Sequence, residues 1–226
     1  MFGEGPLLVV APHPDDEVLG VGGTIARLAA QGREVYVVIV TRADPAIFPD
    51  YSLEEGRGEA MKADDILGVR KTIFLEGFPA ALLDTVPQSA LNAALQREVD
   101  QIDPEFVFVP YPGDLHRDHR VIAEAALVAT RPNKTSRIRG ILAYETLSET
   151  NWNAFPLTSG FVANTYVDIS DFLDAKMGAM RAYKSQVKPF PHERSLEAIE
   201  ALARTRGATA GVKAAEAFAL IRQTYR

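Results

Sequence analysis

Short, nearly continuous apolar runs alternate with longer segments of helical periodicity over the first two-thirds of the chain. Five runs rich in β-branched residues cover residues 7–11, 34–41, 72–76, 106–111 and 138–144. Apolar runs without polar alternation are typical of strands that are covered on both faces of a parallel sheet. Helix-like spacing occupies the intervening residues 18–31, 53–67, 89–101 and 119–130. This order predicts an α/β fold with a doubly wound, mostly parallel sheet and helices on both faces.

The last third of the chain has a less regular pattern. Residues 161–169 are expected to form a further strand. Helical spacing recurs in residues 171–183, 193–204 and 213–223. No linker separates this part from the rest, so we expect residues 1–226 to form one domain. The irregular residues 148–160 contain the sole tryptophan and are either an active-site flap or an ordinary surface loop.

Composition narrows the class of protein. The 226 residues are 47% hydrophobic and 24% charged, as in ordinary globular domains. There is no cysteine, which excludes a disulfide scaffold, a cysteine-ligated metal and a thiol nucleophile. The formal net charge of −6 disfavours extensive electrostatic binding to nucleic acid. No apolar stretch approaches the ~18 residues of a membrane span, and no signal peptide is recognised at the start, so a cytoplasmic location is expected.

Polar side chains with the chemistry of a catalytic centre gather in two short clusters. His13-Pro14-Asp15-Asp16-Glu17 follows the first predicted strand, and His116-Arg117-Asp118-His119 comes shortly after the fourth. In an open parallel sheet, ligands bind beyond the carboxyl ends of the strands, where the strand order reverses. If the strands have the common order 3-2-1-4, the two clusters face each other at that point.

The two clusters contain the residue types of a metal site. His13 and Asp16 are three residues apart at the entry to a helix, so both can turn toward one point. An imidazole from the second cluster would complete a set of two histidines and one carboxylate, which leaves an open position for water as in catalytic zinc sites. The remaining carboxylates and the spare histidine are then available for proton transfer. The alternative is that the acidic residues only complement the helix dipole and that the histidines are structural.

Other signatures of enzyme classes are weaker. Gly20, Gly22 and Gly23 follow the first strand but lack the G-x-G-x-x-G spacing, so close packing of helix on sheet is expected rather than dinucleotide binding. There is neither a G-x-S-x-G elbow nor a P-loop, which disfavours a serine hydrolase and a P-loop ATPase.

The residues of both clusters resemble the signatures of a known family. Residues 11–17 are similar to the A-H-P-D-D-E signature of the PIG-L/LmbE family of N-acetylglucosaminyl deacetylases, and residues 116–119 are similar to its H-x-D-H motif. The resemblance continues in the tail, at residues 183–186, 206–207 and 215–218, and so covers nearly the whole chain.

This resemblance implies a Rossmann-like fold and a zinc-dependent hydrolysis that removes acetyl from an N-acetylated amino sugar or its conjugate. His13, Asp16 and His119 match the family's metal ligands, for Zn²⁺ or alternatively Fe²⁺. Asp15 matches the general base, and His116 matches the group that stabilises the oxyanion or protonates the leaving amine. Asp118 matches a carboxylate that buttresses the histidines. By resemblance, the partner is a small acetamido sugar and the protein is a homo-oligomer.

The sequence departs from the family where the sugar is recognised. Many relatives have an Asp-Gly pair soon after the third strand, where this chain has Ala80 and Ala81, and Asp84 is the nearest possible replacement. Arg57 and His192 are expected to bind substrate, the alternative for Arg57 being a solvated helix face. The basic residues 131–139 either contact a phosphate of the substrate or form a solvated loop.

Two other functions compete with the deacetylase. A non-haem iron oxygenase also uses two histidines and one carboxylate, but the α/β pattern and the spare Asp15 favour hydrolysis. A carbohydrate-binding relative with a degenerate site is the other alternative, and the complete catalytic set argues against it.

Overall fold

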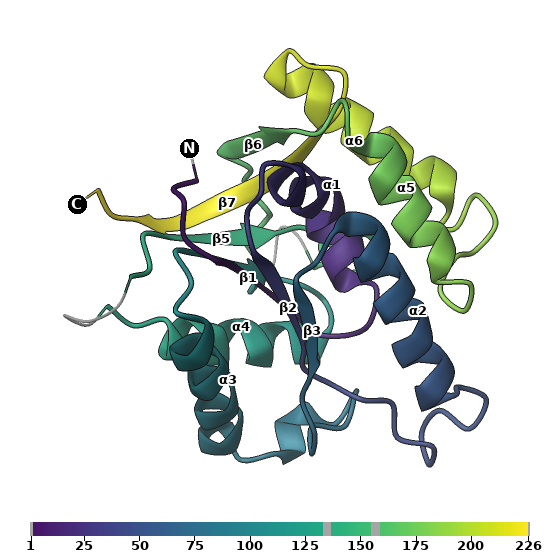
Figure 1. The fold of residues 1–226 in the computed structure, drawn as a ribbon. Helices are drawn as coiled ribbons and strands as arrows, with labels where there is room; N and C mark the ends of the chain where they lie inside the picture. The colour runs from purple at the N-terminus through teal and green to yellow at the C-terminus, as the bar shows by residue number, and fades with distance from the viewer. Residues whose placement is uncertain (1, 133–136, 155–158, 226) are drawn as a thin grey trace.

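The computed structural model describes residues 2–132, 137–154 and 159–225. The strands of this part are β1 (Leu7–Ala11), β2 (Val35–Ile39), β3 (Lys71–Phe74), β4 (Phe106–Pro110), β5 (Gly140–Tyr144), β6 (Thr165–Asp168) and β7 (Ala215–Gln223). The helices are α1 (Asp16–Ala30), α2 (Leu53–Leu67), α3 (Gln88–Ile102), α4 (Arg117–Ala129), α5 (Leu173–Ala182) and α6 (Leu196–Ala210), with a 3-10 turn, η1 (Leu83–Thr85). The strands form a sheet with helices on both faces (Figure 1), which confirms the predicted α/β class.

The strand order places the ends of β1 and β4 side by side. The sheet runs β3-β2-β1-β4-β5-β7-β6, so the expected order 3-2-1-4 is confirmed. β1 pairs in parallel with β2 on one side and with β4 on the other. Chain connections leave β1 and β4 toward opposite faces, and a crevice therefore opens beyond their carboxyl ends.

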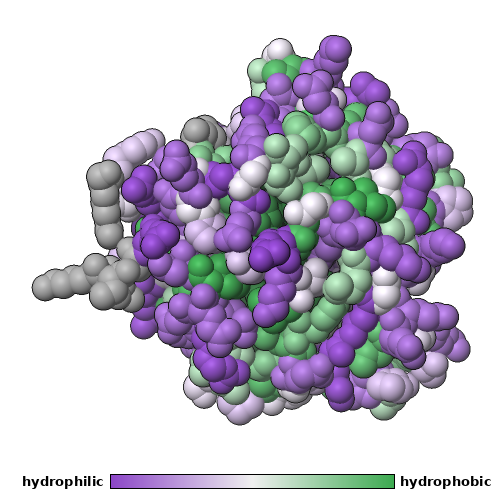
Figure 2. Space-filling view, in the orientation of Figure 1, coloured by the Kyte–Doolittle hydropathy of each residue, from purple (hydrophilic) through white to green (hydrophobic). Residues whose placement is uncertain are grey.

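The two faces of the sheet have separate hydrophobic cores. Leu7, Val9 and Ala11 of β1 point toward α1, α2, α5 and α6. Leu8 and Val10 point toward α3 and α4. Every residue of β1 is buried, which explains why this strand reads as a continuous apolar run. On the face seen in Figure 2, hydrophilic side chains cover most of the surface and hydrophobic side chains lie between them in separate patches.

The glycines of α1 bring this helix close to its neighbours. A Cβ atom on Gly20 would lie 2.2 Å from the ring of Tyr144, and one on Gly23 would lie 2.6 Å from Ile169. These contacts confirm the packing role expected for the glycines of α1.

The prediction of a helix over residues 213–223 is wrong. These residues form β7, which lies between β5 and β6 and is antiparallel to both. The segment is rich in alanine, glutamate and leucine, which favour helices, but pairing on both edges overrides that preference. The helices of the described part include none that is long and apolar enough to cross a membrane.

Candidate active site

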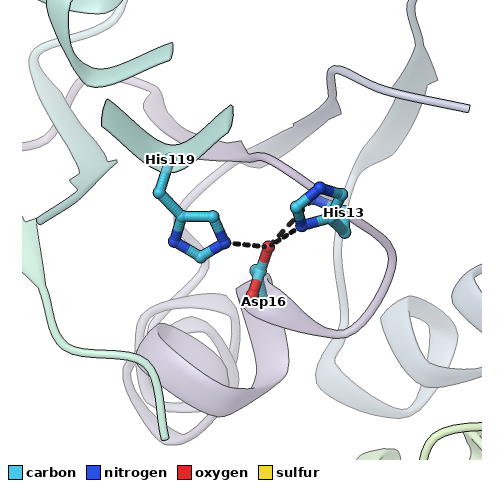
Figure 3. A group of neighbouring side chains, drawn as sticks. All are labelled: His13, Asp16 and His119. Carbon is cyan, nitrogen blue, oxygen red and sulfur yellow. Dashed lines mark hydrogen bonds and ion pairs between the residues drawn. The ribbon is translucent and has the colours of Figure 1, made fainter. Parts of the chain in front are cut away.

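Two loops at the carboxyl edge of the sheet bring the sequence clusters together. His13 and Asp15 lie between β1 and α1, whose first residue is Asp16. His116 caps the start of α4, and His119 lies in its first turn. Asp16 Oδ2 accepts a hydrogen bond from the backbone N–H of His13 (2.9 Å), which closes the first loop on itself. His13, Asp16 and His119 point toward a common centre (Figure 3).

The three side chains have the spacing of metal ligands. His13 Nδ1 lies 3.3 Å from Asp16 Oδ2, and His119 Nε2 lies 3.2 Å from the same oxygen. One ligand atom from each of the three residues lies within 4.8 Å of the others. Asp16 and His119 are fully buried, whereas His13 is partly open to the cleft.

Two atoms of this group are buried without a hydrogen-bond partner. They are Asp16 Oδ1 and His119 Nε2. Buried polar atoms are nearly always satisfied in folded proteins, because an unpaired one costs about 1–3 kcal/mol. The nitrogen and oxygen donors of this trio fit a divalent cation such as zinc or iron.

The far nitrogens of both imidazoles are held by carboxylates. His13 Nε2–H donates to Asp118 Oδ2 (3.0 Å), and His119 Nδ1–H donates to Asp114 Oδ2 (2.8 Å). Asp114 in turn accepts from the hydroxyl of Thr150 (2.5 Å). This arrangement fixes the tautomer of each ring and turns its other nitrogen toward Asp16, as carboxylates do for histidines that bind metals. Asp114 and Thr150 were missed by the sequence analysis, and the only signal was an acidic residue in the turn after β4.

A second possible trio shares His13. It consists of His13, His116 and Asp118, whose ligand atoms also lie within 4.8 Å of one another. Asp118 Oδ2, however, already accepts from His13 and from the backbone N–H of Ala81 (2.7 Å). His116 Nδ1 accepts from the N–H of Asp118 (3.1 Å). These bonds favour the trio with Asp16 and His119 as the metal group.

The electrostatics of the cluster attract positive charge to its centre. Burial alone would lower the pKa of His13, but hydrogen bonds with Asp118 and Asp16 raise it to about 9. Burial alone would also lower the pKa of His119. The charge of Asp16 and the hydrogen bond to Asp114 outweigh burial and raise this pKa to about 10. The carboxylates therefore stabilise either protons on both rings or a cation between them, and a metal binds in competition with those protons.

Asp15 adopts a strained backbone conformation beside the metal group. Its φ of 107° is rare outside glycine, and its side chain is almost fully buried. Burial raises the pKa of its carboxyl to about 7, although Arg194, 3.3 Å away, opposes the shift. A pKa near neutrality suits a group that must accept a proton and release it again.

Two buried residues that the sequence analysis missed hold Asp15 in this conformation. Glu17 Oε2 accepts from the backbone N–H of Asp15 (3.1 Å), and the hydroxyl of Tyr183 donates to Glu17 Oε1. Glu17 and Tyr183 are both fully buried. The signal for Glu17 was the third acidic residue of the first cluster, and the signal for Tyr183 was the tail segment that resembles the family.

His116 has a different electrostatic environment from the other two histidines. Burial, together with the charge of His13, lowers its pKa to about 4. Asp118 Oδ2 lies 3.9 Å from His116 Nδ1, beyond hydrogen-bond distance. The hydrogen-bond partners of Asp118 Oδ2 are His13 and the backbone N–H of Ala81 rather than His116. With Nδ1 accepting from the backbone, the neutral ring carries its proton on Nε2.

A cleft of about 270 Å³ opens next to these groups. Its lining comprises His13, Pro14, Asp15, Thr41, Ala43, Phe48, Tyr51, Ala80, Ala81, His116, Gln186 and Arg194. Ala81 has a φ of 63°, a conformation that glycine adopts more easily. The cleft joins the metal group to a mostly uncharged outer region.

The two residues expected to bind substrate lie outside this lining. The guanidinium of Arg57 donates to Glu76 and lies 5.0 Å from the ring centre of Phe74. His192 is exposed, and its Nδ1 accepts from the backbone N–H of Arg194 (3.0 Å). Arg194, two residues farther along, is the one that reaches the cleft, and Asp84 is exposed in η1 away from the lining.

The basic residues 131–139 lie at the opposite edge of the sheet as far as they are described; residues 133–136 fall outside the described part. Arg137 pairs with Asp103, and Arg139 pairs with Glu105, both of which precede β4. The carboxyl ends that carry the cleft are at the other end of the strands, so Arg137 and Arg139 lie away from the cleft. Residues 155–158 of the expected flap also fall outside the described part, while Trp152 beside them is half exposed.

The fold and the histidine–aspartate group define an α/β protein with a candidate metal centre at the switch point of a parallel sheet. The sequence model of the PIG-L family, described as GlcNAc-PI de-N-acetylase, matches residues 8–130. This match spans more than half of the chain, and the chain belongs to the PIG-L family. It is thus a member of a family of deacetylases, as the resemblance of its motifs implied.

Similar proteins cover most of the chain. A protein of Escherichia coli K12, described as the uncharacterized deacetylase YaiS, is 29% identical over 79% of this chain and 90% of its own. The 1D-myo-inositol 2-acetamido-2-deoxy-alpha-D-glucopyranoside deacetylase of Saccharomonospora viridis is 28% identical, over 82% of this chain and 86% of its own.

Solved structures confirm the fold. The conserved protein TT1542 of Thermus thermophilus has a TM-score of 0.77 and 30% identity, and the match covers 97% of this chain and 96% of that one. The N,N'-diacetylchitobiose deacetylase of Pyrococcus horikoshii has a TM-score of 0.75 and 25% identity, over 96% and 84% of the two chains. GalB, a 4-carboxy-2-hydroxymuconate hydratase of Pseudomonas putida, has a TM-score of 0.77 at 21% identity over 98% of each chain, which shows a shared fold alone.

Proposed function

We propose that this protein is a metal-dependent N-deacetylase that hydrolyses the acetamide of an N-acetylated amino sugar or sugar conjugate. The observation that carries the proposal is the group of ligand atoms of His13, Asp16 and His119, which lie within 4.8 Å of one another next to Asp15, with His13 lining the cleft. His13, Asp16 and His119 would hold the metal, with Zn²⁺ as the expected ion and Fe²⁺ as the alternative. Such an ion supplies Lewis acidity toward water and the amide carbonyl.

Asp15 is the group that moves the proton. Its carboxyl lines the cleft, and its pKa of about 7 allows it to take a proton from the attacking water. The same proton is then available for the nitrogen of the leaving amine. Water and the acetamide thereby become acetate and a free amine, with no other reactant. Arg194 holds the carboxyl in place from the side of the cleft.

His116 stabilises the oxygen that becomes negative during the attack. Its neutral ring lines the cleft and carries a proton on Nε2, so it can donate a hydrogen bond without being charged. Donors aimed at such an oxygen typically contribute about 10²–10³ in rate. Asp118 acts on His13 and on the Ala81 backbone, and its role is to orient these groups.

The direct test is the release of acetate and free amine from a panel of acetamido sugars. The panel should contain free N-acetylglucosamine, its simple glycosides, a disaccharide and a nucleotide-linked form, each incubated with the zinc-loaded and the iron-loaded protein. Acetate and amine in equal amounts are expected from at least one member. Consumption of oxygen and a 2-oxo acid, or hydration of an unsaturated acid without any acetate, would overturn the proposal.

The remaining expectations concern assembly and organisation. We propose one domain over residues 1–226, since both cores pack on the same sheet. The family resemblance supports a homo-oligomer, the net charge of −6 supports the absence of a nucleic-acid partner, and a cytoplasmic location stays a prediction. Light scattering of the purified protein would test the oligomer.

A further inference from the structure

The outer part of the cleft is built from rings and methyl groups. Phe48 and Tyr51 come from the segment between β2 and α2 and both line the cleft. Phe48 is 37% exposed, so part of its ring is accessible from the cleft. Ala80 and Ala81 form another part of the lining.

The ring of Tyr51 is fixed in position. A Cβ atom on Gly56 would lie 1.8 Å from the Tyr51 hydroxyl, so the missing side chain at Gly56 lets the phenol lie against the first turn of α2. Burial and the charges of Asp15 and Glu59 raise the pKa of Tyr51 to about 12, which keeps the hydroxyl protonated. Tyr51 is therefore a rigid, neutral surface close to Asp15.

Three polar groups of the cleft are already engaged. Arg194 is the sole lysine or arginine among the described residues of the lining, and its guanidinium lies within 3.6 Å of the carboxylates of both Asp15 and Glu149. The hydroxyl of Thr41 donates to a backbone carbonyl (2.8 Å), and the N–H of Ala81 donates to Asp118.

Cations near the cleft are engaged as well. Arg42 lies 3.6 Å from Glu76, and Arg57 is bound to the same carboxylate. Phosphate is bound most strongly by cationic side chains such as those of lysine and arginine, and the described lining offers one, a guanidinium that two carboxylates already share.

We propose that Phe48 and Tyr51 form a stacking subsite for a neutral ring joined to the acetamido sugar, and that phosphate-bearing conjugates are poor ligands. The inference rests on the proposed deacetylase function, because it describes the part of the same substrate that lies beyond the acetamide. Aromatic faces bind the apolar face of another ring, either an aryl group or the C–H face of a second sugar. Binding there replaces the hydroxyl contact that Ala80 cannot make.

Kinetics with matched substrates test the subsite. The kcat/KM for an aryl glycoside and for a neutral disaccharide of N-acetylglucosamine is expected to exceed that for the methyl glycoside and the nucleotide-linked form by about 3–10-fold. A preference for the aryl form alone would identify an aryl group as the ring, and a preference for the disaccharide alone would identify a second sugar. Equal values for all four substrates, or a preference for the nucleotide-linked one, would overturn the proposal.

Substitutions test whether the side chains of Phe48 and Tyr51 cause the preference for ring-bearing substrates. Phe48→Ala and Tyr51→Ala should each reduce kcat/KM for the ring-bearing substrates more than for the methyl glycoside, and Tyr51→Phe should restore the preference. Ile47→Ala is the matched control, because Ile47 neighbours Phe48 and is 39% exposed but lies outside the lining. A loss of preference in Ile47→Ala equal to that in Phe48→Ala would contradict a specific role of the ring.

A binding measurement separates this proposal from the proposed function. Phenyl β-glucosaminide has the ring but no acetyl group, so calorimetry can measure its affinity whether or not the protein is a deacetylase. Phe48→Ala should weaken this affinity about 3–10-fold relative to wild type and to Ile47→Ala. Unchanged affinity would refute the subsite even if acetate is released. Absence of acetate together with a Phe48-dependent affinity would refute only the deacetylase.

Discussion

Two clusters of buried charge contact helix α1, and their hydrogen bonding differs completely. At the amino end of the helix, the metal-site cluster (His13, Asp15, Asp16, Asp118 and His119) leaves several polar atoms without partners. Farther along, the Lys176–Glu216 cluster has none: Glu216 accepts from Lys176 (2.6 Å) and from the N–H groups of two residues of α1, and Lys176 also donates to a carbonyl of α1.

The difference separates a binding site from a structural contact. Lys176 and Glu216 are as deeply buried as the metal-site residues, so burial of charge does not by itself indicate a ligand. What distinguishes the metal-site cluster is that ligand atoms of His13, Asp16 and His119 lie within 4.8 Å of one another, while buried polar atoms of the cluster have no hydrogen-bond partner. Charge that is fully hydrogen bonded connects parts of the fold, whereas charge that is left open requires a further partner.

Removal of a metal ligand should have the largest effect. His119→Ala takes away the one nitrogen of the metal group that is buried and unpaired, so bound metal is expected to fall to background and acetate release to stop. Elemental analysis and turnover measure the two losses. Full metal content in this variant would mean that the open atoms around Asp16 are not the metal site.

Loss of the proton-transfer group should come next. Asp15→Asn keeps the shape of the side chain and should keep the metal, while kcat falls about 10²–10⁴-fold because the amide cannot accept a proton. Steady-state kinetics on the metal-loaded variant gives the value. Near-normal turnover would place the base at another residue.

The Lys176–Glu216 cluster should respond in stability alone. Lys176→Met leaves Glu216 buried and charged without its partner, which is expected to reduce the free energy of unfolding by about 3–5 kcal/mol. Metal content at saturation should stay unchanged. Denaturant unfolding measures the stability, and elemental analysis measures the metal content. A loss of metal without a loss of stability would show that the two clusters do not differ as described.

Asp64 is an intermediate case that sharpens the comparison. Oδ2 of this buried carboxyl accepts from the hydroxyl of Thr72 (2.6 Å), whereas Oδ1 has no partner and, in the described part of the chain, belongs to no metal group. Burial raises its pKa from 3.8 to about 7, so this carboxyl is partly protonated near neutral pH and carries less charge than the metal-binding carboxylate of Asp16, whose pKa is lowered.

The raised pKa of Asp64 determines the direction in which stability changes with pH. As the pH rises from about 4 to about 7, the folded state binds more protons at Asp64 than the unfolded state, so stability should fall through this range. Asp64→Asn should remove that loss and be more stable than wild type at pH 8, by on the order of 2–4 kcal/mol. Parallel pH profiles of denaturant unfolding for the two proteins would contradict the assignment.

The smallest effect is expected from a group that only orients a ligand. Asp114→Asn keeps one oxygen for His119 but removes the charge, so metal affinity should fall about 10–100-fold while the site remains intact. Competition with a chelator measures the change. An unchanged affinity would show that the ring of His119 is oriented by packing alone.

The sequence predicted the parts of the site that depend on local order. The clusters at residues 13–17 and 116–119 each follow a strand, and the rule for parallel sheets then places them together. The grouping of His13, Asp16 and His119 agrees with that prediction, while the roles of these residues stay proposals. Strands β1, β4 and β5 were predicted well because every one of their residues is buried, which leaves a clear apolar run.

The sequence did not reveal features that depend on long-range pairing. Arg57 pairs with Glu76 rather than lining the cleft. His192 also lies outside the cleft lining, whereas Arg194 is part of it. No local sequence pattern distinguishes these outcomes. Strand β7 was taken for a helix because its residues favour helices in isolation. Glu216 within it is buried only because Lys176 and α1 satisfy it, and these partners come from other parts of the fold.

The position of β7 also determines when the fold can be completed during synthesis. Glu216 lies 193 positions after Gly23, the residue of α1 to which it is bound. At translation speeds of about 5–20 residues per second, α1 leaves the ribosome roughly 10–40 s before the strand that stabilises it. Helix α1, which begins at the metal-site loop, is therefore synthesised early, but β7, which stabilises it, is synthesised last. Nascent chains paused before β7 should expose this helix to proteases and chaperones, although every candidate metal ligand has already been made.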